Sequence, residues 1–340
     1  MAYVLGGANN EADGFTTAIA GFALRAMHES IGLVNMTNVV TPTQGNEFLV
    51  PQFAPITYAD YNANSTAGTW GTGNANVQNP SLGQGSITAT PAVATTAFDI
   101  FYGWTTSFQL AATLGAELGD SFAEKVDQRV AAAFLAFKAT KDNTYYATSA
   151  DGFQRVSALG AMELLPSGDT PGNAVAGFTA NTVTQLVRNV KQNFKVARMP
   201  GSPVIVIDSN GDDGVIGSTL NRLLSELTGG AVSQTGGSNL SALGNELLQT
   251  GKIENIYGCQ VMATTFLPSA TRTVDGTANV SCLVGGYFGD SAIFTVMKEG
   301  LQLKSGETPG GLQMWLTGVG YFGAGVGDGR RGGAINIQQG

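Results

Sequence analysis

The chain has 340 residues and a mass of 35.0 kDa, enough for one large or two ordinary domains with a buried core. Only 12% of the residues are charged, about half the usual share of roughly 25%, while 43% are hydrophobic and 47 are glycine. The net charge of −8 argues against a protein that grips nucleic acid by neutralising phosphates, and the glycines lack the period of three that defines collagen. We expect a folded protein whose surface is mostly neutral and polar.

The first third of the chain predicts one short helix and then a long extended segment. Residues 12–34 carry apolar side chains near the helical period, which predicts a helix there. From Asn35 to about Ser107 the composition changes to Thr, Asn, Gly, Gln and Pro, flanked by stretches that alternate like strands. This pattern predicts a long extended hairpin or arm. No Lys or Arg occurs between Arg25 and Lys125.

Residues 114–140 form the clearest predicted element, a long amphipathic helix. Its apolar residues are spaced by fours and a final three: Leu114, Leu118, Phe122, Val126, Val130, Phe134 and Phe137. Acidic residues gather toward its start, and Lys138 and Lys141 lie at its end, which suits the helix dipole.

The rest of the chain predicts a helix-strand-helix layer followed by strands. A helix at 180–197, a buried strand at 203–208 and a helix at 213–228, stopped by Gly229 and Gly230, indicate an α/β layer. Beyond a flexible loop, the segments IENIYG, CQVMATTFL, NVSCLVGGYF, AIFTVMKEGLQLK, LQMWLTGVGYFGAGV and GAINIQ predict successive strands. The fold class is therefore α+β.

Three sequence features could indicate a reactive, metal-binding or phosphate-binding site, but their surrounding sequence argues against each. Cys259 and Cys282 lie in apolar, strand-like stretches and are predicted to be small buried hydrophobes. The segment 208–214 resembles the start of a calcium loop, but its glycine falls one place late and Thr219 stands where a bidentate Glu is needed. Gly318–Gly323 matches GxGxxG without a helix start behind it, so we expect a strand and turn.

The sequence therefore predicts no catalytic residue, no cofactor and no metal. His28 is the only histidine, and no nucleophile motif lies near it. The basic residues Arg188, Lys191, Lys195 and Arg198 predict a solvated helix face. Arg330 and Arg331 predict either a charge pair at a surface turn or a contact to carboxylates of another subunit, with equal weight. No segment has the pattern of a signal peptide or a membrane span.

The order of these elements resembles the major capsid proteins of tailed bacteriophages, which have the Hong Kong 97 fold. KIENIYGCQVMATTFLP is similar to the family's strand pair around a Gly turn, and YFGDSAIFTVMKEGLQLK to its late segment in which an apolar strand crosses to a charged edge. The resemblance implies an N-terminal arm at 1–54, an extended E-loop at 55–108, a P-domain at 109–177 with its spine helix at 114–140, and an A-domain at 178–285. Residues 286–340 would return through the P-domain and add a C-terminal A-domain strand.

The resemblance implies a shell subunit that is not an enzyme. Its partners would be further copies of itself in hexamers and pentamers, a separate scaffolding protein, a portal protein at one vertex, a cement or decoration protein, and packaged DNA without sequence-specific contact. Such a protein is synthesised in the host cytoplasm and resides in the virion, without a membrane. Trp70, Asn74, Asn76, Arg330 and Arg331 are the expected inter-subunit contacts.

Two other functional classes remain as alternatives. One is another self-assembling structural protein, such as a tail-tube or surface-layer subunit, for which richness in Gly, Thr and Asn is equally suitable. The long helix at 114–140 argues against a tube subunit. The other is a hydrolase acting through two carboxylates, whose separation a sequence does not reveal.

Overall fold

The computed structural model describes two compact units of the chain. The described residues are 32–42, 45–53, 82–99, 107–141, 146–148, 154–156, 159–172, 178–197, 199–209, 218–235, 252–307 and 313–339. Unit 1 comprises Met1–Phe48, Ile87–Ala136 and Ile293–Gly325, and unit 2 comprises Leu49–Ser86, Phe137–Ala292 and Val326–Gly340. Each unit is therefore built from segments that lie far apart in the sequence.

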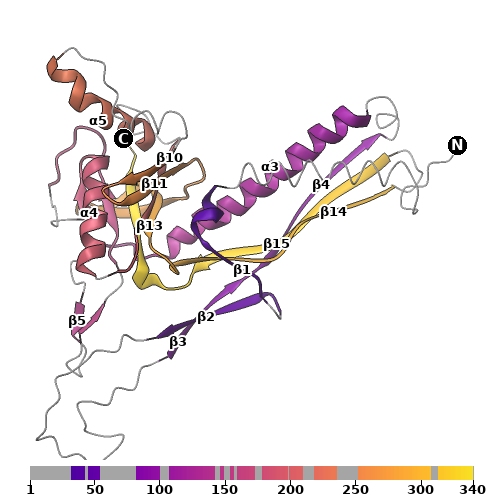
Figure 1. The fold of residues 1–340 in the computed structure, drawn as a ribbon, viewed down its shortest axis with the longest axis horizontal. Helices are drawn as coiled ribbons and strands as arrows, with labels where there is room; N and C mark the ends of the chain where they lie inside the picture. Colours follow the sequence, from indigo (N-terminus) through magenta and orange to yellow (C-terminus); the bar gives the residue numbers. More distant parts are fainter. Residues whose placement is uncertain are drawn as a thin grey trace, which may run out of the picture. The chain divides into compact units, whose positions relative to one another are not determined.

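Unit 1 is a four-stranded sheet with one long helix on it. The strands are β1 (Asn38–Val40), β14 (Ile293–Glu307), β15 (Gln313–Val326) and β4 (Thr90–Asp99), in that spatial order. β1 runs parallel to β14, whereas β15 and β4 are antiparallel with a register that joins Phe322 to Thr90. Helix α3 (Ser107–Ala133) runs along the long strands of this sheet (Figure 1). The 3-10 helix η1 (Leu33–Met36) precedes β1.

The face of β15 that meets α3 combines large apolar side chains with glycine. Leu316 and Phe322 are fully buried, and the ring of Phe322 packs edge-on against that of Phe122 on α3, with 5.1 Å between centroids. A Cβ at Gly320 would lie 2.2 Å from the Phe122 ring. The glycines of the GxGxxG segment therefore lie within β15, so the predicted strand is confirmed and the predicted turn is not found there. Gly320 lets the helix approach.

Gly323 of β15 lies against the backbone of the neighbouring segment, which predicts a strong effect of a single methyl group. A Cβ there would lie 2.2 Å from the carbonyl oxygen of Thr88, and this oxygen belongs to backbone that has little room to move. We expect Gly323→Ala to destabilise the protein by about 1–3 kcal/mol. Gly300 of β14 is the matched control, because nothing lies within 4 Å of a Cβ at that position. Equal unfolding midpoints of the two variants in denaturant would contradict the close approach.

The long helix is confirmed, but both of its predicted ends are wrong. It begins at Ser107 instead of 114, and Leu110 extends the four-residue spacing of apolar side chains by one step toward this start. It ends at Ala133 and is followed by the 3-10 helix η2 (Phe134–Ala136). Phe134 and Phe137 are both buried, and their spacing of three is the period of a 3-10 turn. The apolar pattern thus continues past the end of the α-helix at Ala133.

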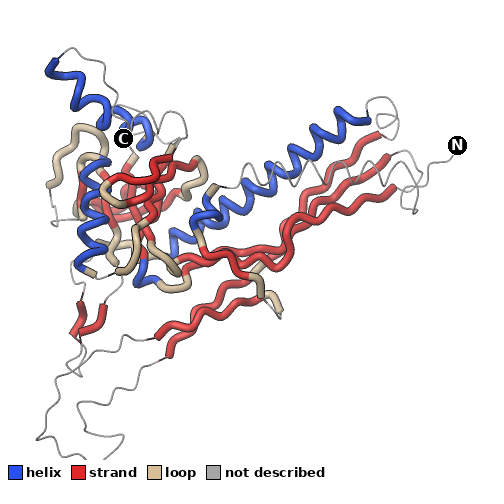
Figure 2. Tube along the Cα trace, in the orientation of Figure 1, coloured by secondary structure: helices blue, strands red, loops and turns tan. Residues whose placement is uncertain are grey.

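Unit 2 is an eight-stranded sheet covered by helices. The spatial order is β10-β11-β9-β13-β16-β7-β8, with β12 paired to β13. The strands are β7 (Met162–Leu164), β8 (Thr179–Ala180), β9 (Val204–Asp208), β10 (Lys252–Ile256), β11 (Cys259–Thr264), β12 (Ser269–Val274), β13 (Thr277–Phe288) and β16 (Gly332–Gln338). The helix-strand-helix layer and the C-terminal strands are therefore confirmed. Figure 2 shows the strands of this unit in red beside its blue helices.

Helix α4 (Val183–Val196) packs on this sheet with the apolar face that its sequence predicts. Val183, Leu186, Val187, Val190 and Phe194 are all buried. The Phe194 ring lies 6.0 Å from that of Tyr287 on β13, and the Cys259 thiol of β11 lies against the carbonyl of Val187. The helix begins where Thr182 accepts a hydrogen bond from the backbone of Gln185, which is the role of an N-cap residue.

Glu226 of helix α5 (Thr219–Thr235) joins this helix to the start of α4. Glu226 of α5 accepts hydrogen bonds from the backbone N–H groups of Val183 (2.7 Å) and Thr184 (2.8 Å). Arg222, one turn earlier, pairs with Glu226 and donates to the carbonyls of Leu165 and Asn181. The free N–H groups of the α4 terminus are thus satisfied by a side chain of the neighbouring helix.

Three further predictions need correction or fall outside the described residues. Helix α5 starts later than predicted, where Ser218 accepts a hydrogen bond from the backbone of Asn221, and it continues through Gly229 and Gly230. Each glycine costs a helix only about 1 kcal/mol relative to alanine, so the pair does not end it. The hairpin of β12 and β13 was not predicted, although Asp275–Gly276 is a strong turn signal. Of the predicted helix at 12–34, residues 12–31 lie outside the described part.

The predicted extended hairpin is present at its base. Strands β2 (Glu47–Phe53) and β3 (Leu82–Thr88) form a two-stranded sheet of their own. Residues 54–81, which include the predicted contacts Trp70, Asn74 and Asn76, lie outside the described residues. A second small pair joins β5 (Tyr146–Thr148) to β6 (Gln154–Val156).

Candidate assembly surfaces

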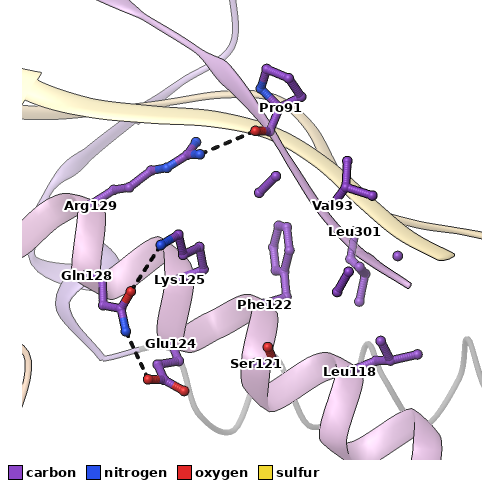
Figure 3. Close-up of a pocket in the computed structure, with 13 residues that line it drawn as sticks. Pro91, Val93, Leu118, Ser121, Phe122, Glu124, Lys125, Gln128, Arg129 and Leu301 are labelled. Carbon is purple, nitrogen blue, oxygen red and sulfur yellow. Dashed lines mark hydrogen bonds between the residues drawn. The ribbon is translucent and has the colours of Figure 1, made fainter. Parts of the chain in front are cut away.

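An open groove of about 340 Å³ runs between α3 and β4 in unit 1 (Figure 3). Its walls are Pro91–Ala94 of β4 and the α3 face that carries Leu118 and Phe122. Its polar side chains bond to one another: Gln128 donates to Glu124 at 2.9 Å and accepts from Lys125 at 3.4 Å. None of these groups is a nucleophile held by a base, so the groove offers a surface for contact instead of a catalytic arrangement.

Arg129 closes one end of the groove and ties α3 to the sheet. Its guanidinium donates to the carbonyls of Thr90, Pro91 and Phe322. The guanidinium carbon also lies 4.2 Å from the centroid of the Phe322 ring, which is the geometry of a cation–π contact. Burial lowers the pKa of Arg129, and the group stays charged because arginine does not lose its proton in proteins.

Asp127 of α3 anchors the chain that leads into β1. Its carboxylate accepts hydrogen bonds from the backbone N–H groups of Gly32 (3.1 Å), Leu33 (3.3 Å) and Val34 (3.3 Å). Thr37 then bonds to Thr295 of β14 through their hydroxyl groups at 2.7 Å. Burial raises the pKa of Asp127, and the three N–H groups oppose that rise. A polar anchor inside unit 1 thus fixes the start of the described chain.

The outer edge of β4 carries Val93, the most exposed large apolar side chain in the described part of unit 1. Within the described part of the chain β4 pairs with β15 alone, so its other edge has no partner strand. Val93 in its middle is 62% exposed, and Thr95 on the same face bonds to Thr317 of β15 at 3.0 Å. An edge strand of ten residues with an exposed valine is the kind of surface that pairs with another chain.

Arg330 and Arg331 lie in the 3-10 turn η3 (Gly329–Arg331) and bind a carboxylate of their own chain. Arg330 holds Asp328 with two hydrogen bonds of 2.8 Å, and the guanidinium of Arg331 lies 3.5 Å from the same carboxylate. Arg331 also donates to the carbonyl of Asp290 at 3.2 Å. Their side chains are 31% and 39% exposed, so the plain interpretation, a charge pair at a surface turn, describes this geometry, and a contact to another subunit stays a prediction.

The Asp328 cluster predicts a loss of stability in acid. Burial raises the pKa of Asp328, but the hydrogen bonds and charge of Arg330, with the charge of Arg331, outweigh it and hold the pKa below its ordinary value. A carboxylate whose pKa is depressed by folding stabilises the fold above its unfolded pKa of about 3.9 and loses that contribution as pH falls through the folded value. We therefore expect Asp328→Asn to lower the thermal midpoint at pH 6 and to have a smaller effect near pH 2.5. An equal loss at both pH values would contradict this.

The other residues singled out in the sequence carry structural roles where they are described. Cys259 and Cys282 are buried as predicted, and burial raises the pKa of each thiol to about 11. Arg188 and Lys195 are exposed on α4, while Lys191 donates to the carbonyl of Gly258 at 3.2 Å. His28 and Arg198 lie outside the described residues.

The described residues contain neither a metal-binding cluster nor a membrane-spanning helix. Within them, no group of three or more His, Cys, Asp or Glu side chains is placed to hold a metal ion. No helix in the described part of the chain is both long and apolar enough to cross a membrane.

Sequence reasoning missed the three features that organise unit 1: Asp127, Arg129 and the edge of β4. The first two lie in the helical pattern as ordinary polar residues, and nothing in the sequence reveals that their partners are backbone groups far away. The third had a signal, because a strand-like stretch without charge that contains Pro91 is typical of an edge strand.

Comparison with known proteins gives similarity at the level of structure. No protein-family model and no curated protein matches the chain. The capsid of cyanophage P-SCSP1u aligns with 90% of this chain and 87% of its own, at 16% identity and a TM-score of 0.58. The capsid of an empty GTA particle aligns over 91% and 90%, at 11% identity and a TM-score of 0.57. The mature capsid of bacteriophage PhiM1 aligns over 88% and 85%, at 14% identity and a TM-score of 0.53.

The chain has the Hong Kong 97 fold. Each alignment covers nearly the whole length of this chain and of the capsid chain, so the structural similarity extends over both units. The Hong Kong 97 fold thus accounts for the α+β architecture, with a long helix on a long sheet in unit 1 and a helix-covered sheet in unit 2.

Proposed function

We propose that this chain is the major capsid protein of a tailed bacteriophage, and that copies of it assemble into a closed icosahedral shell around double-stranded DNA. The observation that carries the proposal is the fold, because the capsid proteins that share it align over about 90% of the chain. The unpaired edge of β4 and the open groove beside it add surfaces that suit contacts with other chains.

Composition and charge support the same function. A shell subunit buries surface against several neighbours at once, which suits a charged fraction of only 12%. The net charge of −8 keeps the subunits from adhering to densely packed DNA, whose phosphates attract basic surfaces. The shell therefore encloses the DNA without reading its sequence, and the chain acts as a structural protein instead of an enzyme.

The finer parts of the proposal follow from the capsid function. The subunits form hexamers and pentamers, and the shell includes a portal protein at one vertex. A separate scaffolding protein guides assembly, and the outer surface of the mature shell is open to a cement or decoration protein where the virion has one. The arm, E-loop, P-domain and A-domain have the boundaries given in the sequence analysis.

Electron microscopy of the purified chain, expressed alone and with its scaffolding protein, tests the proposal. Closed shells with pentameric and hexameric capsomers are the expected result. Tubes would indicate a tail-tube subunit and flat lattices a surface-layer protein. A compact monomer at high concentration, with scaffolding protein supplied, would contradict any assembly function.

A mature shell of this chain should be held together without covalent links. In some capsid proteins that the chain resembles, an E-loop lysine attacks an asparagine of a neighbouring subunit and forms an isopeptide bond. Here residues 26–124 contain no lysine, so the loop lacks that nucleophile. Mature particles boiled in denaturant should run as a single band near 35 kDa. A ladder that survives reducing agent would show that a lysine elsewhere, such as Lys138 or Lys141, forms the link.

A further inference from the structure

The free edge of β4 differs from a protected edge strand in three ways. It is ten residues long, whereas protected edges are short. The stretch from Thr90 to Phe98 carries no charged residue, although a lysine is the usual guard of an exposed edge. The register with β15 is continuous, so no bulge twists the strand away from a partner.

Two observations identify the backbone groups that point away from β15. Pro91 has no N–H group and is tolerated in a strand where that position faces outward. The hydroxyls of Thr95 and Thr317 lie 3.0 Å apart across the two strands, as side chains do in the closer, non-hydrogen-bonded pairs of an antiparallel ladder. Both observations indicate that the backbone N–H and C=O groups of the odd-numbered residues of β4 point away from β15. The N–H and C=O groups of Val93, Thr95 and Ala97 are therefore the ones that no described strand pairs with.

We propose that β4 pairs antiparallel with β4 of a second copy of this chain, about a two-fold axis at Thr95. This inference rests on the proposed function, which supplies the second copy. It joins two four-stranded sheets into one continuous sheet across the contact. The β4 strand of each subunit is thereby added to the edge of the other subunit's sheet.

The sequence of the edge is self-complementary in this register. With the two-fold axis at Thr95, Val93 of each copy lies opposite Ala97 of the other copy, and the two Thr95 residues lie opposite each other. Every outward N–H and C=O group of these three residues then has a hydrogen-bond partner. Val93, 62% exposed in the single chain, gains an alanine as its cross-strand neighbour. No like charges meet, because the paired stretch has none.

The ladder ends at Pro91 for a structural reason. Pro91 offers no N–H group to a new strand, and its carbonyl accepts a hydrogen bond from Arg129 at 3.4 Å. A partner strand is therefore confined to the part of β4 that follows Pro91. This limit favours the register centred on Thr95 over one that slides toward Thr90.

A cysteine at the centre of the contact tests the proposal in assembled particles. In Thr95→Cys the two thiols would lie on Cα atoms about 5.5 Å apart, within the range of roughly 4.4–6.8 Å that a disulfide spans. The two native cysteines are fully buried, so the introduced thiol is the accessible one. We expect mild oxidation to convert most of the variant into a dimer of twice 35.0 kDa on a non-reducing gel.

Thr96→Cys is the matched control. Position 96 is next to position 95, and its side chain lies on the opposite face of the strand. In the proposed register it is opposite Ala94 of the second copy. The two introduced cysteines would therefore lie on Cα atoms about 8 Å apart, which is beyond the reach of a disulfide. The expected result is a dimer from Thr95→Cys and none from Thr96→Cys. Normal shells in which Thr95→Cys gives no dimer, or both variants give the same amount, would overturn the pairing while leaving the capsid function intact. Absence of any assembly by the unchanged chain would instead overturn the proposed function.

Discussion

Replacing Asp127 with alanine should destabilise unit 1 by about 2–4 kcal/mol. The carboxylate is the acceptor for the backbone N–H groups of Gly32, Leu33 and Val34, and the last two residues are fully buried. A buried donor left without an acceptor costs about 1–3 kcal/mol. Alanine also removes the cost of burying a carboxylate, the same burial that raises the pKa of Asp127, and this offsets part of the loss.

Denaturant unfolding of Asp127→Ala beside Glu117→Ala measures this effect. Glu117 is an exposed carboxylate on the same helix, so its removal changes the net charge equally while leaving the backbone of residues 32–34 satisfied. We expect the Glu117 variant to unfold within about 0.5 kcal/mol of the unchanged chain, as surface substitutions usually do. Equal stability of the two variants would show that Asp127 is not the anchor. Hydrogen exchange should also speed up at Leu33 and Val34 in the Asp127 variant alone.

The local elements of this fold could be predicted because their apolar spacing survives in the structure. The apolar residues that the pattern of α4 selects are all buried, and the strand at 203–208 is largely buried, as its composition indicates. Element ends were harder, because Phe134 and Phe137 keep the apolar pattern going through a 3-10 turn and Ser218 sets the start of α5 by a single hydrogen bond. Periodicity reports burial, and burial does not distinguish one kind of helical turn from another.

The contacts that organise unit 1 join residues that are far apart in sequence, and this is why they escaped prediction. Asp127 binds backbone groups more than ninety residues earlier, and Arg129 reaches the carbonyl of Phe322. Backbone partners leave no trace in the identity of a residue, so no motif encodes them. Arg330 and Arg331 show the opposite case, since their carboxylate partner Asp328 lies only two and three residues earlier in the sequence. The sequence predicts a surface turn for this basic pair, although it does not single out Asp328 as the partner.

Proline at position 126 should prevent the protein from folding to a soluble subunit. Val126 is fully buried in the middle of α3, the helix on which the sheet of unit 1 packs. Proline removes a backbone donor and its ring clashes with the preceding turn, at a cost of about 3 kcal/mol or more. The total stability of a domain is only about 5–15 kcal/mol, and loss of the valine side chain adds to the cost. We expect insoluble protein and no shells.

Val126→Ala separates the two contributions. Alanine keeps the N–H group and favours the helix, so it removes the packing of the side chain alone. We expect this variant to stay soluble and assemble, with a lower unfolding midpoint, because the helix that supports Phe122 and Arg129 against the sheet remains continuous. Shells of normal yield from Val126→Pro would contradict a continuous helix through Val126. If both variants were insoluble, the loss of solubility would be due to the lost packing of the valine side chain. The difference between the two variants therefore measures how far shell formation depends on an unbroken α3.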